Sequence, residues 1–222
     1  MKRFVSVFGA LCLCACMAAA SDENPAAALA SLEVGEYAEY GGAIRVGLPR
    51  QFDVGAEGDE EAFLFVGSLR LRIEAINKTA EDITIQATLY HLGDDSQDET
   101  EVANEQVVSL AFDDMESVDD LVLWVTNLII SPDEGDTILS QDIVDMDLAV
   151  EGLPSLGVEE AEIAWFTIDS LWRDEGEQET RVATRIGFTG EAHFLGVAGV
   201  ETRAINDTMD MRIALTILPL DQ

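Results

Sequence analysis

Apolar and polar residues alternate with a period of two through most of the chain after residue 36. Successive side chains of a β-strand point to opposite faces, so this period predicts strands with one apolar and one polar face. The alternating segments are 36–48, 62–76, 83–91, 105–112, 142–150, 161–173, 181–195 and 209–218. Residues 161–173 are apolar on both faces at their centre, which is typical of a strand that is covered on both sides.

One segment follows a helical period instead. Apolar residues recur at spacings of three and four over 121–129, and Pro132 ends the pattern. Ser117 and Asp120 resemble a capping box, with Asp in place of the usual Glu or Gln. The pattern predicts one amphipathic helix over about 118–130, which either packs on the sheet or covers the open end of a barrel.

Together these elements predict an all-β fold, an antiparallel sandwich or barrel of about eight or nine strands with one amphipathic helix. The chain lacks the alternation of strands and helices that is typical of a parallel sheet. Residues 161–218 are expected to form a meander of about three or four strands. A membrane-spanning barrel is disfavoured, because the second face of the strands carries Asp, Glu and Arg where lipid requires apolar residues.

The N-terminal segment has the layout of a secretory signal peptide. Lys2 and Arg3 form a basic start, an apolar run covers 4–15, and small residues precede Ser21. The run of about twelve residues is shorter than the roughly 20 that cross a bilayer as a helix. The expected organisation has three parts: a signal peptide over 1–20, a tether or short helix over 21–35, and a single acidic β domain over 36–222.

Two processing sites compete in this leader. Cleavage after the small residues that precede Ser21 gives an ordinary secreted protein. Residues 13–16 (Leu-Cys-Ala-Cys) resemble a bacterial lipoprotein box, in which Cys16 becomes the acylated N-terminus. Both products are exported, so we expect a periplasmic or extracellular protein, or one held at an outer surface by a lipid on Cys16.

All the cysteines of the chain lie in the leader, at Cys12, Cys14 and Cys16. The domain that remains after cleavage cannot form an internal disulfide, although export normally permits one. Zinc–thiolate sites and cysteine nucleophiles are excluded from it for the same reason.

The chain is strongly acidic, with 12 Lys and Arg, 44 Asp and Glu, and a formal net charge of −32. Such a charge repels nucleic acid and anionic lipid, so we expect no nucleic-acid partner, and membrane contact only through the lipid anchor. The remaining interpretations are a solvated acidic coat suited to high salt, cation binding by carboxylates, and a basic partner. The spread of the acids along the whole chain favours the coat.

Two acidic loops are candidates for calcium binding. Asp94 and Asp98 lie in one loop, and Asp133 and Asp136 in the other. Calcium takes about six to eight oxygen ligands, and an EF-hand loop needs a glycine in its sixth position. Glu99 stands where that glycine belongs, so the first loop departs from the pattern. We expect no cofactor, with weak calcium binding in these loops as the alternative to solvated acids.

The tryptophans give the remaining candidate for a ligand contact. Trp165 and Trp172 are seven positions apart and therefore point to opposite faces of a regular strand. Core packing is their ordinary role, and Trp172, near the strand end, is the candidate for stacking on a ligand. His91 and His193 belong to no metal-ligand spacing.

The sequence contains neither a G-x-S-x-G elbow nor a glycine-rich phosphate loop. The favoured hypothesis is a non-enzymatic exported β domain that binds an unknown protein or small-molecule ligand. One alternative is a lipocalin-like carrier with an apolar ligand inside a β-barrel, which requires an internal cavity of several hundred Å³. The other is a carboxylate-dependent hydrolase, which requires two buried acids with raised pKa in a cleft.

Overall fold

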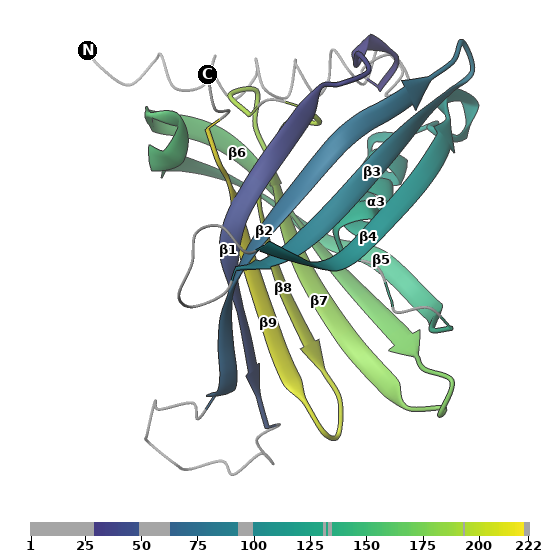
Figure 1. Ribbon diagram of the computed structural model, residues 1–222, viewed down its shortest axis with the longest axis vertical. Coiled ribbons are helices and arrows are strands. Elements are labelled where there is room, and N and C mark those ends of the chain that lie inside the picture. Colours follow the sequence, from purple (N-terminus) through teal and green to yellow (C-terminus); the bar gives the residue numbers. More distant parts are fainter. Residues whose placement is uncertain are drawn as a thin grey trace.

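Nine antiparallel strands and the helix α3 dominate the computed structural model, which describes residues 29–48, 63–92, 100–130, 132, 135–192 and 194–219 (Figure 1). The strands are β1 (Tyr37–Gly47), β2 (Phe63–Lys78), β3 (Asp82–Leu92), β4 (Thr100–Ala111), β5 (Thr137–Leu153), β6 (Val158–Arg173), β7 (Glu179–Phe188), β8 (Val197–Ile205) and β9 (Asp210–Ile217). The helix is α3 (Val118–Ile129), and η1 (Phe112–Asp114) and η2 (Pro154–Leu156) are short 3-10 turns.

All nine described strands belong to one sheet, in the order β4-β3-β2-β1-β9-β8-β7-β6-β5. This order joins two meanders, β1 to β4 and β5 to β9, through the pairing of β1 with β9. The sheet curls into a half-barrel with β4 and β5 at its ends, and α3 connects these two strands (Figure 1). The all-β antiparallel prediction is confirmed. The described strands form one curled sheet, a half-barrel, and not the two packed sheets of a sandwich.

One face of the sheet, which we call the inner face, carries the main hydrophobic core. Its strands contribute Ile168, Ile186 and Val200, each at most 1% exposed. Val122 and Val125 of α3 belong to the same buried cluster. The helix therefore packs on the inner face, which was one of its two predicted positions. We call the opposite face of the sheet the outer face.

The helix α3 begins at the capping box that the sequence predicts. The side chain of Ser117 accepts a hydrogen bond from the backbone N–H of Asp120, and the Asp120 carboxylate accepts one from the N–H of Ser117. Near the other end, the side-chain amides of Asn127 and Gln141 exchange two hydrogen bonds of 3.0 and 2.8 Å. This pair fixes the helix to β5.

The main departure from the sequence prediction lies between β7 and β8. The strand expected over 181–195 ends at Phe188, and β8 follows as a strand that the alternation did not reveal. Phe194 and Leu195 have φ of 47° and 61°, in the left-handed region, so the chain turns there. The first four residues of β8 are all buried, which removes the alternation from the sequence of this strand.

Strand β5 is longer than the segment 142–150 that the sequence predicts. Its pairing with β6 shifts register at three places, around Ser140, Val144 and Gly152. Each such bulge exchanges the residues that face inward and outward, so an apolar–polar alternation cannot be followed through it. Strand β4 is longer as well and begins at Thr100.

The described end of the segment 21–35 contributes to the core. Leu29 is only 1% exposed and belongs to the main cluster. The ammonium group of Lys78 donates hydrogen bonds to the backbone carbonyls of Ala30 and Leu32, which hold this segment against the end of β2. The expected signal peptide and Cys16 lie outside the described residues. Within the described ranges, no helix has the length and apolar character needed to cross a membrane.

Candidate functional site

Six neighbouring strands each contribute one residue to a row across the outer face, and five of these residues are charged. The strand registers place one residue of each strand directly opposite the next, from β5 through β6, β7, β8 and β9 to β1. The members in that order are Asp142, Asp169, Ala183, Arg203, Arg212 and Arg45. We call this the charged row. Its two aspartates are the acidic pair, and its three arginines are the arginine ladder.

The arginine ladder places like charges opposite one another on adjacent strands, which lie about 4.8 Å apart. Opposed like charges destabilise a sheet. In a chain with 44 acids and 12 basic residues, charge balance alone would pair each arginine with an acid. Strands β1 and β2 show that arrangement, because Arg72 lies opposite Glu39 and forms an ion pair with it. In the ladder, Arg203 and Arg212 share one carboxylate, that of Asp210.

One carboxylate orients two guanidinium groups of the ladder. Arg203 donates hydrogen bonds of 2.9 and 2.6 Å to the two oxygens of Asp210. Arg212 lies 3.5 Å from one of the same oxygens. The hydrogen bonds from Arg203 hold the pKa of Asp210 below its ordinary value, and the charge of Arg212 acts in the same direction.

A stacked pair stands beside the row. The guanidinium carbon of Arg185 lies 4.3 Å from the centroid of the Trp165 ring, and Arg185 also forms an ion pair of 3.9 Å with Glu201. Trp165 lies opposite Gly187, where an added Cβ would come within 2.9 Å of the indole ring. The indole therefore lies over β7 because glycine leaves room for it. Its Nε1 donates a hydrogen bond of 3.2 Å to Glu151.

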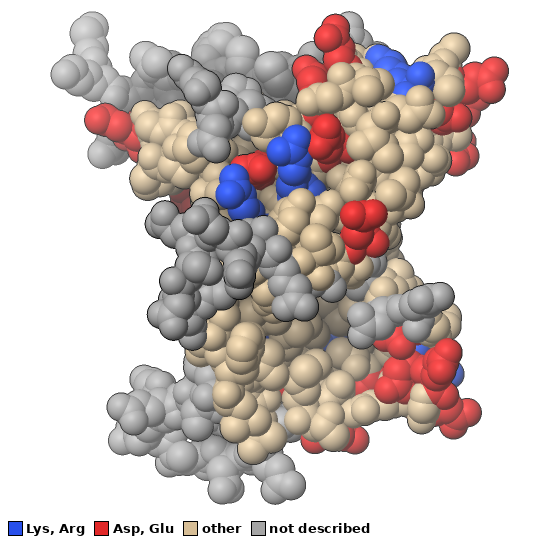
Figure 2. Space-filling view, viewed as in Figure 1, with Lys and Arg blue, Asp and Glu red and all other residues tan. Residues whose placement is uncertain are grey.

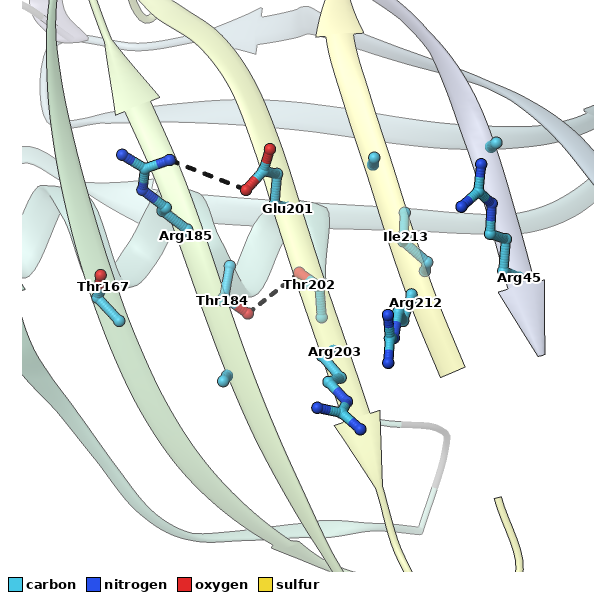
Figure 3. Close-up of a pocket in the computed structure, with 12 residues that line it drawn as sticks. Arg45, Thr167, Thr184, Arg185, Glu201, Thr202, Arg203, Arg212 and Ile213 are labelled. Atoms are coloured by element: carbon cyan, nitrogen blue, oxygen red, sulfur yellow. Dashed lines mark hydrogen bonds and ion pairs between the residues drawn. The ribbon is translucent and has the colours of Figure 1, made fainter. Parts of the chain in front are cut away.

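The outer face is hollowed in two adjoining places along the row. The first hollow has a volume of about 520 Å³ and is lined by Arg45, Arg185, Arg203 and Arg212, with the small Ala43, Ala183 and Ala214 among them (Figure 3). The second has a volume of about 530 Å³ and is lined by residues that include the acidic pair and Arg181. Ala183 and Arg203 line both hollows, so we treat the two as one groove.

The first hollow gathers four arginines and one acid, Glu201. Figure 2 shows acidic side chains spread around the face in view and basic side chains in only a few places. In the close-up, the arginines project from four adjacent strands over one area of the sheet (Figure 3). A guanidinium group stays protonated at physiological pH and offers several donors in a planar fork that matches a carboxylate or phosphate. The arrangement is therefore suited to binding an anionic group.

The residues that the sequence singled out lie elsewhere. Trp172 is half-buried on the inner face and packs against the main core, opposite to Trp165 as predicted. Asp136 is half-buried just before β5, whereas Asp94, Asp98 and Asp133 lie outside the described residues. Within the described ranges, no group of three or more His, Cys, Asp or Glu is placed to hold a metal ion. Weak calcium binding in the acidic loops and ligand stacking on Trp172 both stay predictions.

The sequence analysis missed the charged row. Its members lie far apart in the sequence, and only the strand registers bring them side by side. A partial signal was present, because Arg45 and Arg212 both occupy polar positions of alternating segments in a chain with few basic residues. Arg203 had no such signal, since β8 was not predicted.

No protein-family model matches this chain, and no curated protein is significantly similar to it.

Proposed function

We propose that this protein is an exported, non-enzymatic binding protein that holds an anionic group of its ligand on the arginine ladder. The observation that carries the proposal is the register that sets Arg203, Arg212 and Arg45 side by side. All three guanidinium groups line one hollow of the outer face, and their planar donors match the geometry of a carboxylate or phosphate.

The residues around the ladder support binding over catalysis. Arginines, small side chains and threonines make up most of the first hollow. Guanidinium groups do not exchange protons near neutral pH, so they position and neutralise an anion without acting as general acids or bases. The residues Ala43, Ala183 and Ala214 leave the sheet accessible between the charged side chains.

An NMR titration with N-acetyl-trialanine, which carries one carboxylate and no amine, tests the proposal. We expect saturable shifts of backbone amides in β1, β7, β8 and β9, and their loss in the variant Arg212→Gln. Arg173→Gln is the matched control. It removes the same charge, and Arg173 is paired with Glu179 at the end of β6, away from the ladder. Absence of saturable shifts in the unmodified protein would reject the ladder as a binding site.

Carriage of an apolar ligand is the second candidate function. On β5, Met146 and Leu148 lie opposite Phe166 and Ala164, which belong to the main core. The side chains of Met146, Leu148 and Val150 are nevertheless 53, 48 and 62% exposed. Contiguous exposed apolar side chains at one end of a half-barrel are suited to an acyl chain or similar group. Binding of a fluorescent fatty acid that is abolished by Leu148→Ser and retained in Arg212→Gln would favour this candidate over the groove.

The exported location rests on the leader alone. Mass spectrometry of the mature N-terminus distinguishes its two products: a protein that begins at Ser21, or one that begins at an acylated Cys16. A mature chain that retains Met1 would reject export by this signal.

A further inference from the structure

Strand β5 forms one open edge of the sheet. It stands last in the strand order and pairs only with β6 among the described strands. The register of this pairing shifts around Val144 and again around Gly152, and residues 145–151 between these bulges pair without interruption. This regular stretch, which we call the β5 edge, is about 24 Å long.

Every second residue of the β5 edge turns its backbone groups toward the open side. In an antiparallel pair, residues that bond to the neighbouring strand alternate with residues whose N–H and C=O face away from it. The N–H of Met146 donates a hydrogen bond of 3.0 Å to the side-chain carboxylate of Asp145, on the same strand. This bond assigns Met146, Leu148 and Val150 to the residues that face away. Within the described part of the chain, no strand lies on that side to pair with them.

The side chains of the same three residues form an apolar stripe on the inner face. Each is about half exposed or more, although Met146 and Leu148 lie opposite residues of the main core. Natural edge strands are commonly protected by Lys or Pro, and β5 contains neither. Contiguous apolar side chains along an open backbone edge indicate a surface that another chain covers.

The outer face of the β5 edge gives the charge that a partner must carry. Asp145, Asp147 and Glu151 are exposed there, and β5 contains no basic residue. Opposite charges on adjacent strands stabilise a sheet, so Lys or Arg on the pairing segment would be favourable.

We infer that the β5 edge binds a partner protein by strand addition, and that the partner supplies an extended segment in which apolar residues alternate with Lys or Arg. Backbone hydrogen bonds to Met146, Leu148 and Val150 provide affinity, and the side chains of the segment provide specificity. Its apolar residues continue the stripe on the inner face, and its basic residues lie opposite the acids on the outer face. None of the three stripe residues lines either hollow of the groove, so this inference goes beyond the proposed function and stands without it.

Two other occupants account for fewer of these observations. An acyl chain would cover the apolar stripe, but it would leave the backbone groups unpaired and the acids unused. A second copy of β5, paired antiparallel about Leu148, would place Asp145 of one copy opposite Glu151 of the other. The acids of both copies would then gather on one face without a basic residue between them.

Fluorescence anisotropy with labelled seven-residue peptides tests the inference. When it pairs antiparallel, the peptide acetyl-KVTVKVK-amide places its valines opposite Met146, Leu148 and Val150 and its lysines opposite the three acids. We expect saturable binding, and about tenfold weaker binding when the valines are N-methylated, because their amides face β5. N-methylation of the threonine and the two lysines that follow it is the matched control, since these amides face away and the affinity should be retained.

Two substitutions in the protein separate the apolar stripe from the acids. Leu148→Ser should weaken binding of the unmethylated peptide by about tenfold. Val107→Ser is its control, because Val107 is 54% exposed on β4, the other edge of the sheet. Asp147→Asn should weaken binding by about threefold. Its control, Asp113→Asn, removes the same charge at an exposed position of η1.

Lack of saturable peptide binding by the folded protein would overturn the inference, as would binding that N-methylation of the valines leaves unchanged. Binding of a fluorescent fatty acid that Leu148→Ser abolishes, without peptide binding, would assign the stripe to an acyl chain instead. A dimer in sedimentation that Leu148→Ser dissociates, without peptide binding, would assign the edge to a second copy of the chain. The NMR titration of the arginine ladder is independent of all these outcomes, so failure of this inference is distinguishable from failure of the proposed function.

Discussion

The inner and outer faces of β7 and β8 use the same pairing of strands for different purposes. On the inner face Ile186 lies opposite Val200, and Thr184 and Thr202 share a buried hydrogen bond of 3.2 Å. On the outer face Ala183 lies opposite Arg203, next to a ladder of like charges. Opposed residues of the inner face thus pack and hydrogen-bond with one another, which stabilises the sheet. The same strand pairing on the outer face sets arginines of like charge side by side.

The largest expected effect is on the inner face. Ile186→Ala should lower the free energy of unfolding by about 2 to 5 kcal/mol, because Ile186 is fully buried and its loss leaves a cavity. Arg185→Ala, at the residue just before Ile186 on β7, should lower the free energy of unfolding by less than about 1 kcal/mol. Urea unfolding measures both, and equal losses would contradict the division between the faces.

Gly187→Ala should destabilise the protein, because the outer face is closely packed around this glycine. An alanine there would bring a Cβ to 2.8 Å from Ile163 and 2.9 Å from Trp165, which predicts a loss of about 1 to 3 kcal/mol. The displacement of the indole should also change its fluorescence. Gly190→Ala is the control, since no atom lies within 4 Å of its added Cβ. A Gly187→Ala protein as stable as the control would mean that Trp165 is loosely held.

The buried Tyr40, on the inner face, should make the folded protein less stable at alkaline pH. Burial raises the pKa of its hydroxyl above the ordinary value of 10.0, and this hydroxyl has no hydrogen-bond partner among the described residues. Above about pH 10 the unfolded chain loses the Tyr40 proton and the folded chain retains it, so stability falls by up to about 1.4 kcal/mol per pH unit.

Unfolding of Tyr40→Phe between pH 9 and 11 tests this expectation. The variant should lose that part of the pH dependence, and at pH 7 it should be at least as stable as the unmodified protein, since it buries no unpartnered hydroxyl. Tyr90→Phe, at a half-exposed tyrosine, should keep the alkaline loss. An unchanged alkaline limb in Tyr40→Phe would refute the role of Tyr40.

Asp210 gives the smallest expected effect, with the opposite dependence on pH. Its pKa is lowered in the folded protein, so its contribution to stability is present above about pH 4 and is lost as the pH falls through the folded pKa. Asp210→Asn should lower stability at pH 7 by about 0.5 to 1 kcal/mol. The difference from the unmodified protein should disappear in acid, and a difference that persists at pH 2 would assign the loss to packing.

The secondary-structure elements could be predicted from the sequence, whereas the pairing of the strands could not. Alternation identified most strands, and the capping residues Ser117 and Asp120 located the helix. Alternation failed at β8, whose first residues are buried on both faces, and through the bulges of β5. The charged row could not be predicted, because its pairings depend on registers that connect residues as distant in sequence as Arg45 and Arg212.

The pairing of β1 with β9 has a consequence for the order in which the protein forms. Tyr40 and Ile217 become neighbours only when the last strand of the chain reaches the first, and contacts between such distant segments form slowly. Arg45 belongs to the first strand and Arg212 to the last. A chain that emerges with its N-terminus first therefore lacks the complete ladder until β9 pairs with β1. The anion binding that we propose for the ladder would begin only after this pairing has formed.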